Sequence, residues 1–260
     1  MAIEKIISDL FRTGLHAVKK DPMEILNLKH PSQAAQVHAV RCNPELIQYI
    51  EQPCEKAQLE AVRQYPSLVM FLTSPSETVQ MEAVRQDAGV FLYISNPTEK
   101  VKSEVLKHDA GQIIYMGDPK GNLQMQAVEK DESSVMYIEQ PVEAVQIRAV
   151  TENPQLFVYI TCPTERVRYA AVSGYADNIM YIEKPSERLQ VRAVSQDSHT
   201  IRYIEEPCEK AMIIAVKRNP ELSLILPATS RVVNAIAGTY MEELKKNSGT
   251  AGREISEQIP

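Results

Sequence analysis

The sequence predicts an all-α protein, an α-solenoid of about nine full two-helix repeats of 22 residues with divergent caps at both ends. The leading observation is a proline that recurs every 22 residues without insertion or deletion. These prolines are Pro31, Pro53, Pro75, Pro97, Pro119, Pro141, Pro163, Pro185 and Pro207. A fixed period of this length indicates a solenoid, in which each repeat contacts mainly its two neighbours. Position 1 of each repeat is defined as this proline, and positions are numbered to 22.

The first helix of each repeat is predicted over about positions 1–12. Proline suits the first helical turn, because its missing N–H would have no partner there. A glutamate recurs at position 3, near the positive end of the helix dipole. Ser74, which precedes Pro75-Ser76-Glu77, fits a capping box. The glutamates at position 3 are Glu55, Glu77, Glu99, Glu143, Glu165, Glu187 and Glu209.

A shorter second helix is predicted from an N-cap at position 13 to about position 20. Asn and Asp favour N-caps, and they occupy this position in most repeats. The residues are Asn43, Asp87, Asp109, Asp131, Asn153, Asp197 and Asn219. Isolated helices shorter than about 12–15 residues are marginal in water, so both helices must be held by stacking.

An apolar core is predicted along the stack. Position 5 is apolar in every repeat, while position 9 is Ala and position 10 is Val in eight of the nine. Positions 17 and 20 of the second helix are apolar almost throughout. The small alanine indicates that the first helices of successive repeats approach closely.

The two ends depart from the repeat. Residues 1–30 are predicted to form an N-terminal cap helix and a degenerate repeat, and residues 31–226 the nine-repeat solenoid. The apolar residues at helical spacing in the cap are Ile3, Ile6, Ile7, Leu10 and Phe11. Pro227 follows Pro207 after 20 residues instead of 22. Residues 227–246 are therefore expected to be a C-terminal capping helix, and residues 247–260 a disordered tail.

The fourth and fifth repeats depart most from the pattern. Ser103 replaces an apolar residue, and Val105-Leu106 replaces Ala-Val. Lys120-Gly121 then replaces Ser-Glu at the start of the fifth repeat, with Gly117 nearby. We interpret these repeats as a bend or a site, with neutral drift as the alternative.

A residue repeated at one position forms a row along a solenoid. Position 6 carries Gln36, Gln58, Gln80, Gln124, Gln146 and Gln190. We expect these amides to be partly buried and hydrogen-bonded to neighbouring repeats, with a ligand-reading row as the alternative.

A second row is aromatic. Position 19 carries Tyr49, Tyr93, Tyr115, Tyr137, Tyr159, Tyr181 and Tyr203, with Phe71 and Ile225 as substitutes. Packed rings with hydroxyls in water are expected. An aromatic track for nucleobases or an extended peptide is the alternative.

The exposed stripe of the first helix, positions 4, 8 and 11, is the predicted partner-binding surface. In the first half we expect the pairs Glu60–Arg63, Glu82–Arg85 and Glu104–Lys107 to form within single helices. Farther along, the stripe becomes basic and lacks acids. The predicted contact residues are Arg148, Arg166, Arg188 and Arg192, together with Arg41, Arg63 and Arg85. A solvated, self-paired face is the alternative.

Composition narrows the possible functions. A net charge of −6 argues against a general polyanion binder. No apolar run approaches the roughly 18 residues of a membrane span, and no signal peptide opens the chain. The cysteines lack C-x-x-C spacing, which predicts a reduced, cytoplasmic protein. Neither a catalytic constellation nor a phosphate-binding glycine loop is present, so we expect no enzyme activity, cofactor or metal.

The repeat has the consensus Pro-Ser-Glu-x-Val-Gln-x-x-Ala-Val-x-x-Asn/Asp-Pro-x-x-Ile-x-Tyr-Ile. It resembles the short α-helical repeats of HEAT-like and leucine-rich-variant solenoids. More closely, it looks like repeats of uncharacterised bacterial and bacteriophage proteins, over about residues 9–240. The resemblance implies an interaction scaffold with no shared functional residues. A bacteriophage origin would imply an inhibitor that sequesters a host protein, such as a defence factor.

Three functions follow from these observations. The first is a non-catalytic protein-binding solenoid, either a monomer or a side-by-side dimer. The second is a nucleic-acid-binding HEAT-like protein that uses the arginine stripe and the tyrosine row, with affinity that falls steeply with salt. The third is an enzyme acting on a modified base or small molecule, which would need a large pocket lined by polar groups.

Overall fold

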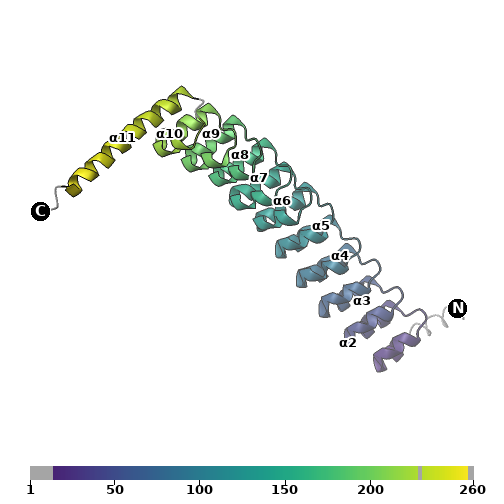
Figure 1. Ribbon diagram of the computed structural model, residues 1–260. Helices are drawn as coiled ribbons and strands as arrows, with labels where there is room; N and C mark the ends of the chain where they lie inside the picture. Colours follow the sequence, from purple (N-terminus) through teal and green to yellow (C-terminus); the bar gives the residue numbers. More distant parts are fainter. Residues whose placement is uncertain (1–13, 228–229, 257–260) are drawn as a thin grey trace. The chain divides into compact units, whose positions relative to one another are not determined.

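The predicted α-solenoid is confirmed by the alternation of α-helices and 3₁₀-helices along the chain (Figure 1). The computed structural model describes residues 14–227 and 230–256, with side chains of the last helix described as far as Lys245. Within these residues the protein is all-α, and no strand is present. The predicted cap helix over residues 3–11 lies outside the described residues.

The first helix of each repeat is an α-helix and the second a 3₁₀-helix (η). The α-helices are α2 (Gln33–Cys42), α3 (Glu55–Gln64), α4 (Glu77–Gln86), α5 (Glu99–His108), α6 (Gly121–Lys130), α7 (Glu143–Glu152), α8 (Glu165–Gly174), α9 (Glu187–Gln196), α10 (Glu209–Arg218) and α11 (Arg231–Ser256). The 3₁₀-helices are η1 (Pro22–Asn27), η2 (Pro44–Tyr49), η3 (Pro66–Phe71), η4 (Ala88–Tyr93), η5 (Ala110–Tyr115), η6 (Glu132–Tyr137), η7 (Pro154–Tyr159), η8 (Ala176–Tyr181), η9 (Ser198–Tyr203) and η10 (Pro220–Leu224).

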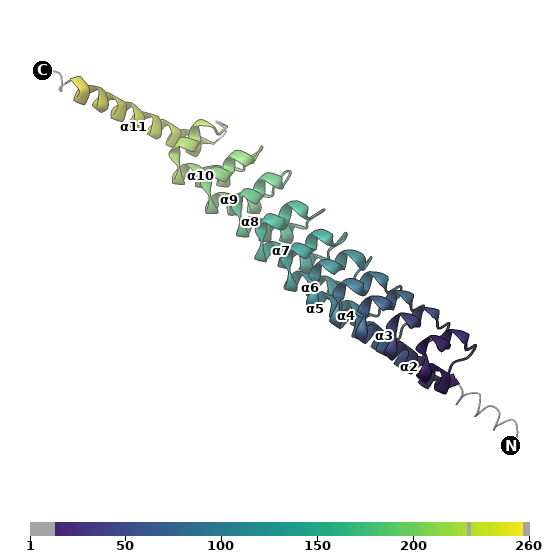
Figure 2. The ribbon, with the colours of Figure 1, turned by 90° about the horizontal axis from the view of Figure 1, so that it is seen from below.

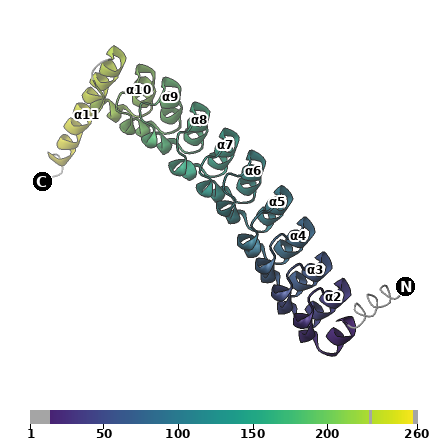
Figure 3. The same cartoon turned by 90° about the vertical axis from the view of Figure 1, so that its right-hand side faces the viewer.

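The chain forms two compact units, Met1–Gln140 and Pro141–Pro260, and the division falls at the start of a repeat. In the first unit, helices α2 to α6 contact one another in order, as do η2 to η6. In the second unit, α7 to α11 and η7 to η9 do the same. Within each unit the α-helices therefore form one layer and the 3₁₀-helices another (Figures 2 and 3).

Each α-helix begins at position 3, two residues later than predicted. The proline at position 1 precedes the helix, and the N-cap is the residue at position 2. Ser76 shows the arrangement, because its Oγ accepts a hydrogen bond from the Val79 N–H at 3.4 Å. The capping box assigned to Ser74 is therefore wrong, because the capping side chain belongs to Ser76, the residue after the proline. The backbone of Ser76 is extended, as is usual for an N-cap.

The glutamate at position 3 has a second role beside its place near the helix dipole. It accepts a hydrogen bond from the N-cap hydroxyl of the next repeat, so that the start of one helix is tied to the start of the next. The pairs are Ser76 to Glu55 at 2.5 Å, Thr164 to Glu143 at 2.6 Å, Ser186 to Glu165 at 2.5 Å and Ser230 to Glu209 at 2.9 Å.

The second helix is 3₁₀ and ends at position 19, except that η10 ends at position 18. Its predicted N-cap is confirmed in most repeats: the Asp87 carboxylate, for example, accepts from the Gly89 N–H at 2.8 Å. Asn219 occupies the same place without such a bond. A 3₁₀-helix has three residues per turn, so positions 14, 17 and 20 line up on one side. That side faces the core together with position 16, which is buried in most repeats, and positions 18 and 19 point away from it.

The predicted core is confirmed. Side chains at positions 5, 9 and 10 are almost completely inaccessible in every full repeat, as Val145, Ala149 and Val150 show in α7. Position 20 is buried from Ile50 to Ile204. Alanine at position 9 leaves no side chain beyond Cβ between neighbouring helices, which permits their close packing.

The glutamine row at position 6 bonds to the backbone mainly within each repeat, and Gln36 and Gln190 also make the expected bond to the next repeat. The buried Oε1 atoms of Gln58, Gln80 and Gln146 have no hydrogen-bond partner among the described residues. Each amide Nε2 donates to the carbonyl oxygen of the proline at position 1 of its own repeat, at 2.7–3.1 Å. Gln36 Oε1 also accepts from the Cys54 N–H of the next repeat at 2.7 Å, and Gln190 accepts from Cys208 at 2.6 Å. A buried amide is thus bonded to backbone groups that precede the helix starts.

Both ends keep the phase of the repeat. In the degenerate first repeat, Val18 and Ile25 are buried at positions 10 and 17. At the other end, Ser230 Oγ accepts from the Val233 N–H at 3.5 Å and so takes the N-cap place of position 2. The 22-residue period therefore continues to the start of α11 at Arg231, and the predicted start of the capping helix at Pro227 is wrong. The helix also includes residues 247–256, which were predicted to be a tail.

Enlarging the alanine at position 9 is expected to overpack the stack. Ala149→Leu should lower the free energy of unfolding by about 1–3 kcal/mol, because Ala149 has no accessible surface between α7 and its neighbour α8. The measurement is urea unfolding followed by circular dichroism. Ala144→Leu, an exposed site on the same helix, is the matched control. Equal effects of the two changes would contradict the packing described above.

Candidate functional site

The arginines of the first unit form ion pairs between repeats. Arg41 pairs with Glu60, Arg63 with Glu82 at 3.3 Å, and Arg85 with Glu104 at 3.0 Å. Each pair joins position 11 of one repeat to position 8 of the next. The predicted pairs Glu60–Arg63 and Glu82–Arg85 within one helix are thus replaced, whereas Glu104–Lys107 forms as predicted at 2.7 Å.

The arginines of the second unit are also bound within the chain. Arg148 pairs with Glu152 at 3.3 Å, and Arg166 with Glu143 at 2.8 Å. The Arg188 guanidinium lies 4.1 Å from the centre of the Tyr169 ring. Arg192 Nε donates to Ser173 Oγ of the preceding repeat at 3.0 Å. The role of the seven arginines in contacting a partner stays a prediction. Each of their guanidinium groups already has a contact within the chain, which a partner would have to replace or share.

The most extensive unusual surface lies on the 3₁₀-helices. Large apolar and aromatic side chains at positions 18 and 19 are exposed in both units, and we call this surface the tyrosine face. In the first unit it comprises Leu26, Tyr49, Met70, Phe71, Leu92, Tyr93, Ile114, Tyr115, Met136 and Tyr137. In the second unit it comprises Val158, Tyr159, Met180, Tyr181, Tyr203, Leu224 and Ile225. The residues at position 19 are 44–63% exposed, so the rings lie largely in water.

The sequence reasoning missed position 18. It predicted that the side chains at positions 17 and 20 are buried and that the ring at position 19 is packed with its hydroxyl in water, and it made no prediction for position 18. The available signal was the length of this helix: six residues that start with proline or a small residue suit a 3₁₀ turn, in which the side chains repeat every three residues, so that positions 18 and 19 lie opposite the buried positions 16 and 17. Position 18 is then a second exposed apolar site beside each ring.

The surface is hollowed between successive 3₁₀-helices. Each hollow described below is lined by the side chain of position 6 and by the position 19 ring of the same repeat. Gln36 and Tyr49 line one of about 490 Å³, Gln124 and Tyr137 one of about 480 Å³, and Gln190 and Tyr203 one of about 600 Å³. The tyrosine face is therefore a series of rings separated by shallow hollows.

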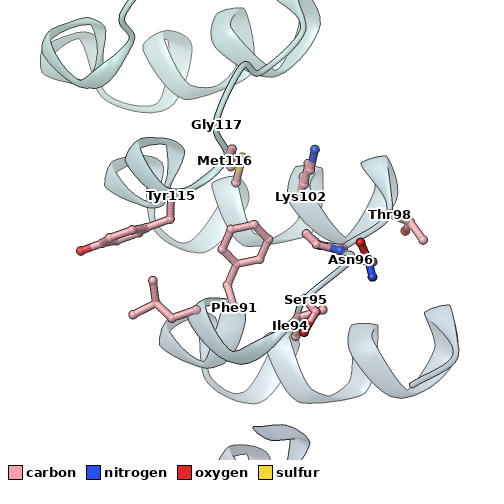
Figure 4. Close-up of a pocket in the computed structure, with 11 residues that line it drawn as sticks. Phe91, Ile94, Ser95, Asn96, Thr98, Lys102, Tyr115, Met116 and Gly117 are labelled. Carbon is pink, nitrogen blue, oxygen red and sulfur yellow. The ribbon is translucent and has the colours of Figure 1, made fainter. Parts of the chain in front are cut away.

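A hollow of about 710 Å³ lies where the sequence becomes irregular (Figure 4). Lys102 replaces the glutamine of position 6 here, and its Nζ lies 3.3 Å from Glu99 Oε1. Met116 is helical where other repeats are extended, and Gly117 has a φ of +70°. The phenyl ring of Phe91, which is almost completely buried, lies between Tyr115 and Lys102 in this view. This geometry agrees with a local departure in the fourth repeat.

The flanks of the tyrosine face are acidic in the first unit. Positions 13–22 of its five full repeats are the segments 43–52, 65–74, 87–96, 109–118 and 131–140, which contain no Lys, Arg or His. They contain Glu45, Glu51, Asp87, Asp109, Asp118, Asp131, Glu132 and Glu139. Basic side chains from outside these segments line two of the hollows. Lys29 and His30 line the hollow beside Tyr49, and Lys102 of α5, which is paired with Glu99, lines the hollow beside Tyr115.

The described part of the chain lacks features of a metal site and of a membrane span. There, no three His, Cys, Asp or Glu side chains gather closely enough to hold a metal ion. No helix in that part has the length and apolar character that crossing a membrane requires. Cys42, Cys54, Cys162 and Cys208 are all free thiols.

Comparison with known proteins adds no relative. The chain matches no protein-family model, no curated protein and no solved structure.

The ion pairs between repeats predict a pH dependence of stability. Hydrogen bonds from Lys107 and Arg85 hold the pKa of the Glu104 carboxyl below its usual value of 4.5. A lowered pKa contributes stability above the unfolded value, and this contribution is lost as the pH falls through the folded value. Glu104→Gln should thus destabilise the chain by no more than about 1 kcal/mol at neutral pH, since such pairs are partly screened.

The measurement is urea unfolding of wild type and variant at neutral pH and at a pH of about 3, where a carboxylate of ordinary pKa is protonated. The difference between the two proteins should be smaller at the lower pH. Glu129→Gln is the control, because Glu129 is exposed on α6 and makes no ion pair with other described residues. A difference that persists unchanged in acid would show that the pairs do not contribute.

Proposed function

We propose that the chain is a non-catalytic protein-binding solenoid whose contact surface is the tyrosine face. The observation that carries the proposal is the continuous exposure of large side chains at positions 18 and 19 within each unit. Contiguous exposed apolar patches on soluble proteins mark interaction surfaces. Tyrosine and methionine are also enriched in protein interfaces, and both are frequent here.

The acidic surroundings favour a protein over a nucleic acid as the partner. Stacking of bases on the rings would bring phosphates close to segments 43–52 to 131–140 of the first unit, where acids occur without bases. Nucleic-acid binding depends on neutralising phosphates with Lys and Arg, so these flanks would oppose it. The arginines named above belong to the α-helices, which form the other layer.

The biological setting belongs to the same proposal. The resemblance of the repeat sequence is the basis for three parts of it: kinship with HEAT-like repeats, a bacteriophage origin, and sequestration of a host defence protein. A cytoplasmic location is supported by the four free cysteines, which a reducing compartment preserves. Either a monomer or a side-by-side dimer can present the tyrosine face to a partner.

The test is affinity capture from the native cell with wild-type and substituted chains. The variant Tyr93→Ala with Tyr115→Ala removes two neighbouring rings of the tyrosine face. Tyr65→Ala removes an exposed tyrosine of position 13 that lies outside the face and serves as the control. The double variant should recover the specific partner at least about tenfold less well, since aromatic anchors dominate many interfaces.

Circular dichroism and thermal unfolding confirm that each variant is folded. Capture that is unchanged in the double variant would contradict the assignment of the tyrosine face. Specific recovery of nucleic acid, in an amount that falls with increasing salt, would instead favour the nucleic-acid-binding function.

A further inference from the structure

The rings of the tyrosine face recur with the period of the solenoid. In the first unit they are Tyr49, Phe71, Tyr93, Tyr115 and Tyr137, one on each of five successive 3₁₀-helices. Successive 3₁₀-helices contact each other, so the rings stand one repeat apart. Packed helices lie about 8–10 Å apart, which sets the approximate distance between neighbouring rings.

This distance can be compared with the periods of peptide conformations. A polyproline II helix has three residues per turn and a rise of about 3.1 Å, so that one face repeats every 9 Å or so. A β-strand repeats on one face after two residues, about 6.6 Å. An α-helix repeats after one turn of about 5.4 Å, and reaches a similar distance only at every second turn. The polyproline II helix meets one ring per turn.

The chemistry of the tyrosine face fits the same conformation. A polyproline II segment has no internal hydrogen bonds, so its carbonyl groups are free to accept. Tyrosine offers a flat ring for a pyrrolidine and a hydroxyl donor for a carbonyl. The hollows beside Tyr115 and Tyr137 provide space between the rings for side chains of the bound segment. An α-helical partner would have no free backbone carbonyls along its length for these hydroxyls.

The charges indicate the composition of the segment. Eight acidic residues and no basic residue occur at positions 13–22 of the first unit's five full repeats, on both sides of the rings in sequence. Of these, all except the half-buried Glu132 are exposed. A partner that lies along this surface therefore gains from arginine or lysine on the face beside the one that contacts the rings.

We infer that the tyrosine face of the first unit binds a partner segment in the polyproline II conformation that carries prolines together with arginines or lysines. This inference rests on the proposed function and specifies the partner's chemistry. One turn of the segment lies over each repeat, with its prolines against the rings and its basic side chains toward the acidic flanks.

The experiment measures binding of fluorescent peptides built from whole Pro-Pro-Arg turns, by anisotropy at low salt. The reference protein is the full chain with Tyr159→Ala, Tyr181→Ala and Tyr203→Ala, which leaves the first unit's rings intact. Affinity should rise with each added turn until the peptide spans the five rings. Tyr93→Ala should weaken binding of the longest peptide by about fivefold, within the two- to tenfold range of one aromatic contact.

Three controls separate the contributions. Tyr65→Ala should leave affinity unchanged, because this exposed ring lies outside the tyrosine face. A Gly-Gly-Arg peptide of equal length and charge should bind at least about tenfold more weakly, since it lacks the rigid conformation. A Pro-Pro-Glu peptide should not bind, because its charge matches that of the flanks.

The outcomes distinguish the inference from the function on which it rests. Equal binding of the Pro-Pro-Arg and Gly-Gly-Arg peptides, or affinity independent of the number of turns, would overturn the polyproline II assignment. If the Pro-Pro-Arg peptides fail to bind while capture of a natural partner still requires Tyr93 and Tyr115, the inference is wrong and the proposed function stands. If both fail, neither is correct.

Discussion

The close contact between neighbouring α-helices, with alanine at position 9 and valine at position 10, is the constraint on which the rest of the structure depends. A helix of ten residues is too short to be stable alone. Each helix is therefore stable only when its buried side is covered by its neighbours. Because alanine permits one close approach, successive repeats of a unit pack in the same way. A side chain repeated at one position then becomes a row.

The rows have different roles that follow from their positions. Glutamine at position 6 is bonded to backbone groups ahead of the helix, and glutamate at position 3 ties one N-cap to the previous repeat. Arg63 and Glu82 join position 11 to position 8 across a repeat boundary. These polar contacts are individually weak at the surface, but those of the glutamates and arginines are made between repeats and so add to the same interface. The polar side chains named above in the α-helix layer are thus bonded to neighbouring groups of the chain. The rings of the tyrosine face, in contrast, lie largely in water.

The sequence allowed the repeat length, the helix order and the core positions to be predicted, because each depends on a pattern that recurs nine times. The N-cap at position 13 followed from Asn and Asp for the same reason. The start of the α-helix was misplaced because proline is favoured at a first turn, yet here Ser76 behind the proline supplies the cap. The ion pairs were misplaced because spacing within a helix says nothing of the distance to the next one. The exposure of Met70 or Leu92 depended on recognising the second helix as 3₁₀, which composition alone does not decide.

Measuring the accessibility of positions 17 and 18 tests the tyrosine face most directly. Ile179 is buried and Met180 is half exposed on the same 3₁₀-helix, η8. In a chain whose natural cysteines are replaced by serine, Ile179→Cys and Met180→Cys are labelled with a thiol reagent under native conditions. Met180→Cys should react at close to the rate of an unfolded peptide, while Ile179→Cys should react only through local opening. Equal rates, or faster labelling of Ile179→Cys, would contradict the 3₁₀ geometry and the tyrosine face that follows from it.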